Sequence, residues 1–165
     1  MFELGVLALS RALERGAFAD GWSLRGIGSM RGGRRLDLGG GALMELIPRA
    51  PQAGYGAFMR EHDVGLALMY TPHPSLVPIE MAAAGMLTVT NSFENKTPAA
   101  LGAISGNLIA AEPTVEAIAT ALVEAAAGVA DADRRARASR VRWSRDWDQS
   151  FDDALLDRVC SLLEI

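Results

Sequence analysis

The order of apolar and polar segments between residues 65 and 90 constrains the fold more than any other feature. The apolar run Gly65–Tyr70 has the length of a strand, and the short helical segment Pro78–Ala84, Gly85 and a second run, Leu87–Thr90, follow it. A continuous apolar run is typical of a buried strand that is covered on both faces. The connection is too short for other arrangements of the two strands. The pattern therefore predicts two neighbouring parallel strands with a crossover helix between them.

The same alternation extends along the chain. We expect helices at Phe2–Arg15, around Tyr55–Met59, after the capping residue Thr114 and from about Asp131 onward, and strands at Trp22–Ile27, Leu43–Ile47 and Asn107–Ala110. The glycine-rich stretch Gly28–Gly41 is expected to be a loop. Strands that alternate with helices predict an α/β fold, a Rossmann-like parallel sheet with helices on both faces, over residues 1–165 as a single domain.

The chain begins directly with a helical pattern at Phe2, although an α/β domain normally starts with a buried strand that leads into such a helix. Either that first strand is absent or the order of elements differs. An absent strand predicts an exposed apolar edge or slot in the sheet, which would favour a homodimer or strand exchange.

Composition excludes several classes of protein. The net charge of −4 argues against a general nucleic-acid-binding protein. No apolar run approaches the roughly 20 residues of a membrane span, and the N-terminus has no signal-peptide pattern. The single cysteine, Cys160, is surrounded by leucine and valine in the sequence and is expected to be a buried, unreactive thiol. A cytoplasmic location is the prediction.

Physical reasoning places a ligand site in the turn Thr71–Val77. This turn would follow the carboxyl end of a buried parallel strand, where ligands of open α/β sheets bind. A helix that starts near Ser75 would offer free backbone N–H groups to a phosphate. Glu80 is the one carboxylate near the start of that helix. It either accepts hydrogen bonds from a ribose diol or only stabilises its own helix start.

The residues of this segment resemble a known signature. Pro74-Ser75, Pro78, Glu80-Met81-Ala82-Ala83, Gly85 and Thr90-Asn91 resemble the donor site of retaining GT-B glycosyltransferases of family 4. Leu68, Met69, Thr71 to Ser75, Phe93, Asn95 and Lys96 make the segment similar to the rhamnosyltransferase-like branch active in bacterial surface-polysaccharide synthesis. The dense match covers about thirty residues.

The resemblance implies a role for each matching residue. Glu80 would hold the nucleotide ribose, and the loop His73–Leu76, with Pro74 and the amides of Ser75 and Leu76, would cradle the diphosphate and the sugar. Asn95 and Lys96 would approach the donor sugar or phosphate. An earlier glutamate of the family falls on Pro72 here, so its role is lost or has passed to His73. A structural histidine in the turn is the alternative for His73.

The implied activity is transfer of a sugar, rhamnose in that branch, from a nucleotide diphosphate donor such as dTDP-rhamnose to a glycan acceptor, with retention. No metal is implied, because no His, Asp or Cys cluster has ligand spacing, and no cofactor is expected. Because GT-B catalysis lies between two domains, we expect the acceptor domain to be missing and the isolated chain to be inactive. The alternative is a non-catalytic domain that binds a nucleotide or a partner. An oxidoreductase would need a dinucleotide fingerprint, and Gly26-Ile27-Gly28 lacks its third glycine.

Basic residues form two further clusters. Arg31, Arg34 and Arg35 either contact phosphate or an anionic membrane, or belong to a solvated loop. Near the C-terminus, arginines are interleaved with Trp143 and Trp147, which can indicate nucleic-acid binding. However, the apolar residues Trp143, Trp147, Phe151 and Leu155 repeat every four positions. That stripe favours a helix packed on the core or on a partner domain.

Overall fold

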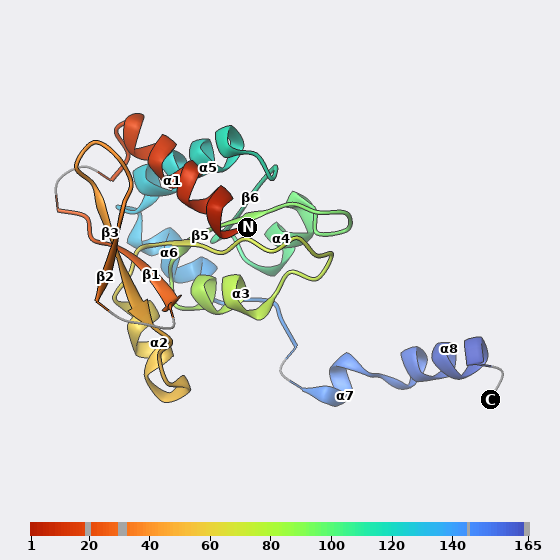
Figure 1. Cartoon of the computed structure of the whole chain (residues 1–165). Coiled ribbons are helices and arrows are strands. Elements are labelled where there is room, and N and C mark those ends of the chain that lie inside the picture. Colours follow the sequence, from red (N-terminus) through yellow and green to blue (C-terminus); the bar gives the residue numbers. More distant parts are fainter. Residues whose placement is uncertain (19–20, 30–32, 145, 164–165) are drawn as a thin grey trace.

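The fold contains two separate three-stranded sheets. The computed structural model describes residues 1–18, 21–29, 33–144 and 146–163. One sheet has the strand order β4-β5-β6, with β4 at Val64–Leu66, β5 at Leu87–Asn91 and β6 at Leu108–Ala111. All its strands are parallel. Helices flank this sheet, so the α/β, Rossmann-like class is confirmed (Figure 1).

The predicted strand–helix–strand unit is confirmed. Val64, Gly65 and Leu66 pair in parallel with Leu87, Thr88 and Val89, and helix α3, Leu76–Ala83, connects the two strands. β4 is shorter than the predicted Gly65–Tyr70, although the N–H of Ala67 still donates to the carbonyl of Val89 at 3.0 Å. Gly65 permits the close packing of α3, because a Cβ there would lie 2.8 Å from Sδ of Met81.

Helices cover both faces of this parallel sheet. On one face, α1 (Phe2–Glu14) and α5 (Val115–Gly128) pack against β5 through a core that contains Ala8, Leu87, Val89, Ile118 and Leu122. On the other face, α3 and α4 (Pro98–Ile104) bury Ala82, Leu101 and Leu108. Figure 1 shows α1 and α5 side by side. The predicted cap is also confirmed, since Oγ1 of Thr114 accepts from the N–H of Ala117 at 3.2 Å.

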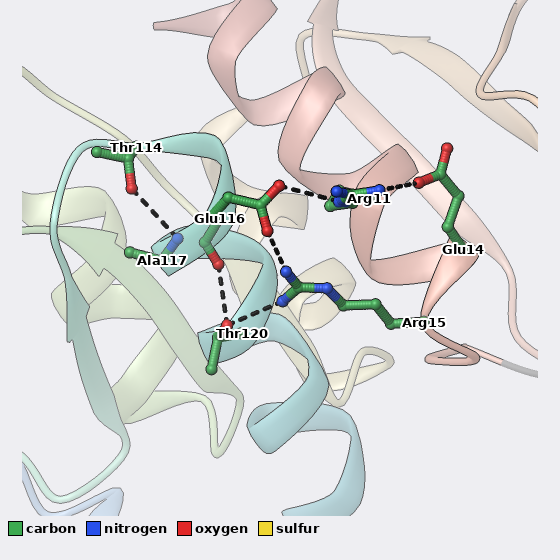
Figure 2. A network of polar contacts seen from close by, with 7 residues as sticks. All are labelled: Arg11, Glu14, Arg15, Thr114, Glu116, Ala117 and Thr120. Atoms are coloured by element: carbon green, nitrogen blue, oxygen red, sulfur yellow. Dashed lines mark hydrogen bonds and ion pairs between the residues drawn. The ribbon is translucent and has the colours of Figure 1, made fainter.

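Exposed ion pairs join α1 to α5 at the surface. The carboxylate of Glu116 accepts from Nε of Arg11 at 2.9 Å and pairs with the guanidinium of Arg15, which also donates to Oγ1 of Thr120 (Figure 2). The side chains of Arg11 and Glu116 are about half exposed. Solvent screens such pairs, so we attribute the attachment of α1 mainly to its buried alanines.

The second sheet contains a strand that the sequence did not predict. Its order is β1-β3-β2, with β1 at Leu24–Ser29, β3 at Leu43–Pro48 and β2 at Arg34–Asp37. β1 and β3 are parallel, as expected of this fold, but β2 runs antiparallel to β3. The expectation of a loop over Gly28–Gly41 was therefore wrong at Gly28–Ser29 and at Arg34–Asp37, while residues 38–41 do form a turn and residues 30–32 lie outside the described residues. Gly39, Gly40 and Gly41 have positive φ values and turn the chain from β2 into β3, and this antiparallel pairing makes Arg34–Asp37 a strand. Helix α2, Gln52–Arg60, follows β3.

The C-terminal segment differs most from its prediction. After α6, Ala132–Ala138, the described residues 139–144 and 146 form no helix or strand. The next helices, α7 at Trp147–Ser150 and α8 at Asp153–Leu163, lie away from the sheets (Figure 1). Trp147, Phe151 and Leu155 are exposed, so the expectation that this stripe packs on the core of this domain was wrong, whereas packing on a partner domain stays a prediction. The four-residue spacing places these side chains on one face only if a single helix carries them. Residues 139–144 are not helical, so Trp143 does not share a helix with Trp147. Cys160 is exposed rather than buried.

Candidate functional site

The candidate site is the turn that follows β4. Its geometry is held by hydrogen bonds between neighbouring residues. Oγ1 of Thr71 donates to the carbonyl of His73 at 3.1 Å, and the N–H of Ser75 donates to Nδ1 of His73 at 3.0 Å. Ser75 has a φ of 68°, in the left-handed region, and is the residue from which α3 begins. A non-glycine residue in this conformation is uncommon and is found where the surrounding structure enforces it.

Two buried side chains hold the backbone of Met69 at the start of this turn. Oδ1 of Asn91 accepts from the N–H of Met69 at 2.8 Å, and Nζ of Lys96 donates to the carbonyl of Met69 at 2.7 Å. Asn91 is fully buried and Lys96 is 2 % exposed. Burial lowers the pKa of the Lys96 ammonium below its ordinary value. The two side chains therefore fasten the end of β4 to β5 and to the residues after β5.

The first turn of α3 faces outward at this end of the sheet. Leu76 and Val77 are its first residues, and both are exposed. The amides of the first helical turn have no partner within a helix, and no side chain caps this one. Pro78 follows them and has no N–H of its own. The helix start therefore presents the amides of Leu76 and Val77, together with the positive end of the helix dipole.

Glu80 lies on the same face of α3, one turn after Leu76. It is exposed, and among the described residues no hydrogen bond or ion pair engages its carboxylate. Glu80 is the fifth residue of α3 and lies beyond the first turn. Stabilisation of the helix start, one of the two interpretations, therefore has no support. The pKa of Tyr55 in α2 is raised by burial and, to a smaller extent, by the charge of Glu80.

His73 is exposed beside the start of α3 and is oriented by two neighbours. Because Nδ1 accepts from Ser75, the neutral ring carries its proton on Nε2. The ring of Trp143 lies edge-on to it, with centroids 6.0 Å apart. The amide of Arg142 donates to the carbonyl of Ile104 at 2.8 Å, which fixes the segment that carries Trp143. The sequence assigned Trp143 to a packed helix and did not predict this contact.

An aromatic pair borders the turn on its other side. Tyr70, directly after Met69, is 60 % exposed, and its ring centroid lies 4.4 Å from that of Phe93. Phe93 and Lys96 close a tight turn through two backbone hydrogen bonds, which leaves Asn95 exposed at its tip. The structure therefore places His73, Pro74, Ser75 and Leu76 at the start of α3, and Glu80 one turn further along the same helix. Lys96 lies beneath this group, bound to Met69, and Asn95 lies on the neighbouring turn.

The segment of Arg142 and Trp143 brings part of the C-terminal basic cluster beside the candidate site, and other basic residues lie elsewhere. Arg34 and Arg35 are exposed on β2, and Arg31 and Arg145 lie outside the described residues. Arg135 binds Asp63 at 2.9 Å and the carbonyl of Gly85 at 2.9 Å, so it fastens α6 to the opposite end of the sheet. Over the described part of the chain, no three histidine, cysteine, aspartate or glutamate side chains are grouped to hold a metal ion. None of the described helices has the length and hydropathy needed to span a bilayer.

Comparisons with known proteins identify the family. The chain is 32 % identical over 160 residues to the O-antigen biosynthesis protein RfbC of Myxococcus xanthus, a match that includes 90 % of this chain and 12 % of that protein. It therefore spans only a small part of the length of this relative. The family model described as "WsaF, C-terminal domain" matches residues 1–123, which include both sheets and the candidate site. The chain belongs to the WsaF C-terminal domain family.

Proposed function

We propose that this chain is the donor-binding domain of a retaining glycosyltransferase of polysaccharide biosynthesis, and that its site binds the nucleoside diphosphate of a sugar donor. Family membership and the relative named for O-antigen biosynthesis support a glycosyltransferase-like role. The start of α3 carries the proposal, because it lies at the carboxyl end of a parallel strand and presents two amides that have no hydrogen-bond partner among the described residues.

The diphosphate would bind at the amides of Leu76 and Val77. Nε2 of His73 would donate a further hydrogen bond to a phosphate oxygen, since Nδ1 is engaged by Ser75. Pro74 shapes the approach to this position. Glu80, one turn along the same helix face, would accept hydrogen bonds from the ribose hydroxyls. The free carboxylate and the free amides are thus separated by about 5.4 Å along the helix axis.

Of the residues after β5, Lys96 would act on the donor site indirectly and Asn95 would contact the donor directly. Lys96 holds the turn in place through Met69, and this role does not require contact with the donor. Asn95, exposed at the tip of its turn, remains the candidate for contact with the sugar. In transfer, such a site would stabilise the departing diphosphate electrostatically and position the donor. We propose dTDP-rhamnose as the donor and a surface glycan as the acceptor.

Calorimetry with dTDP and the Glu80→Gln variant tests the ribose role. The variant should weaken binding by about 1–2 kcal/mol, because a charged hydrogen bond is lost and the shape is kept. Glu124→Gln, which changes an exposed carboxylate of α5, is the matched control and should bind as the parent does. Equal affinities of Glu80→Gln and the parent would show that Glu80 does not hold the ribose.

A second test concerns transfer. Retaining transfer needs a donor, an acceptor and the exclusion of water, and His73, Leu76 and Glu80 of the candidate site are exposed to solvent. The chain alone, incubated with radiolabelled dTDP-rhamnose and glycans, should form no product above background while still binding dTDP. Binding without turnover is also what a non-catalytic nucleotide-binding domain would show. Turnover after an acceptor-binding domain is added would separate the two.

A further inference from the structure

A cavity of about 810 Å³ lies between the two sheets. It is distinct from the candidate donor site, because none of the residues His73–Leu76 lines it. Residues of β1 line it on one side, and residues of β4 line it on the other. Both strands are at the edges of their sheets, and among the described residues no backbone hydrogen bond joins them. The cavity therefore separates two unpaired strand edges.

The backbone of β4 offers hydrogen bonds to this cavity. In a parallel pair, alternate residues direct their N–H and C=O groups to opposite edges of a strand. Leu87 donates to the carbonyl of Asp63, and Ala67 donates to Val89, so residues 63, 65 and 67 are directed toward β5. The N–H and C=O groups of Val64 and Leu66 are consequently directed toward β1 and the cavity. An occupant that is itself a strand would satisfy them.

Both faces of the cavity are covered by apolar side chains. On one face are Phe2, Val6 and Leu9 of α1, and a Cβ at Gly5 would lie 3.4 Å from Leu66. On the other face, Met81 of α3 lies over Gly65, and Phe58 and Met59 of α2 line the wall. These are opposite faces, because Gly65 and Leu66 are consecutive residues of one strand. A strand in this position would have to be apolar on both faces, as central parallel strands are.

The dimensions suit one strand. A strand occupies about 4.8 Å of sheet width and about 10 Å between covering layers, so a cavity of this volume corresponds to about 17 Å of strand, or about five residues. Arg25 of β1 and His62 line the cavity near the amino end of β4. Nη1 of Arg25 lies 3.4 Å from Nε2 of His62. Met1, the residue before α1, lines the cavity, and the neighbouring Gly5 packs near Leu66 and Leu68 toward the carboxyl end of β4.

We infer that this cavity is the seat of an apolar β-strand that runs parallel to β4 and leads directly into α1. The strand would join the two sheets into one, in the order β2-β3-β1-strand-β4-β5-β6. A parallel strand in this position would end near Met1, so a short turn suffices to enter α1. The interaction is strand addition at two edges at once, with backbone hydrogen bonds on both sides of the added strand.

An extended chain tests this inference. Five apolar residues, Val-Ile-Val-Val-Val, and a Gly-Ser turn are placed before Met1, and the matched control carries Ser-Asn-Ser-Ser-Asn in the same position. The apolar extension should raise Tm by about 5 °C or more over the control, because it buries five side chains and pairs two edges. It should also slow hydrogen exchange at the amide of Leu66, which the control leaves exposed.

A blocked variant keeps the test specific to the cavity. Val6→Trp places a large ring in the cavity, so the apolar extension should no longer raise Tm or protect Leu66 in this background. Equal Tm values and equal Leu66 exchange for the two extensions in the parent would overturn the inference. Protection of Leu66 in the unextended chain that grows with protein concentration would also overturn it, because a second copy would then be the occupant.

Discussion

The strand–turn–helix unit between β4 and β5 and the segment from Trp147 to Leu163 are both rich in apolar residues, but only the first is packed. β5 is buried at every position, whereas no residue of α7 or α8 is buried. Around β5, buried polar side chains hold specific backbone groups, as Asn91 and Lys96 hold Met69. The polar contacts of α7 and α8 are mostly between near neighbours in sequence. Apolar residues at helical spacing therefore predict a helix with one apolar face, but they do not identify which part of the protein covers that face.

The largest expected difference between these regions is in the rate of chemical modification of two residues, each the only one of its type in the sequence. Lys96 is the only lysine of the sequence and is buried near β5, whereas Cys160 is the only cysteine and is exposed on α8. In the native protein, a thiol reagent should modify Cys160 nearly as fast as in urea. Acetylation of Lys96 should be about 100-fold slower than in urea, or slower still, because it requires local opening. Peptide mass spectrometry measures both rates, with the amine of Met1 as the internal control.

The contrast should also be measurable in stability. Leu87 is fully buried, and Leu162 is 81 % exposed. Leu87→Ala should lower the free energy of unfolding by about 2–5 kcal/mol, because a buried side chain is removed and a cavity remains. Leu162→Ala should change it by about 0.5 kcal/mol or less. Urea titration followed by circular dichroism gives both values. Similar losses would mean that α8 is packed in solution.

Two asparagines of the same motif sharpen the comparison within the packed region. Asn91→Ala removes a fully buried side chain and leaves the part-buried N–H of Met69 without its acceptor, so it should cost about 1–3 kcal/mol. Asn95→Ala, at an exposed turn, should stay within about 0.5 kcal/mol of the parent. The same titration compares them. If Asn95→Ala is as destabilising as Asn91→Ala, the turn after β5 has a structural role that its exposure does not show.

The sequence predicted the packed region well because two constraints coincide there. The apolar runs determine the strands, and the short connection around Pro78 and Gly85 determines their parallel order. The helix start at Ser75 followed from the same turn residues. The contacts that hold Met69 could not be predicted, since Asn91 and Lys96 lie more than twenty residues from it in sequence. The contact of Lys96 with the donor therefore stays a prediction beside its observed bond to Met69.

Two errors have a different cause. β2 was missed because Arg34–Asp37 has no apolar alternation of its own, and only its pairing with β3 makes it a strand. The C-terminal stripe does not form on one helix because residues 139–144 are not helical and place Trp143 against His73. Pairing and packing between distant segments decide both cases, and local periodicity does not contain that information.

The smallest expected effect concerns removal of the exposed segment as a whole. A chain that ends after Asp146 lacks α7 and α8 but keeps Trp143, Val141 and the hydrogen bond from Arg142 to Ile104. Because no residue of α7 or α8 is buried, Tm should change by about 2 °C or less, although the helical signal in circular dichroism falls. The matched control ends after Arg140. It also loses Val141, which packs against the core on the α4 side, and the contact of Trp143 with His73, so its Tm should fall further. If the two truncations have the same Tm, residues 141–146 contribute nothing to the fold. If the chain that ends after Asp146 is already several degrees less stable than the parent, α8 packs on the domain and the comparison between the two regions fails.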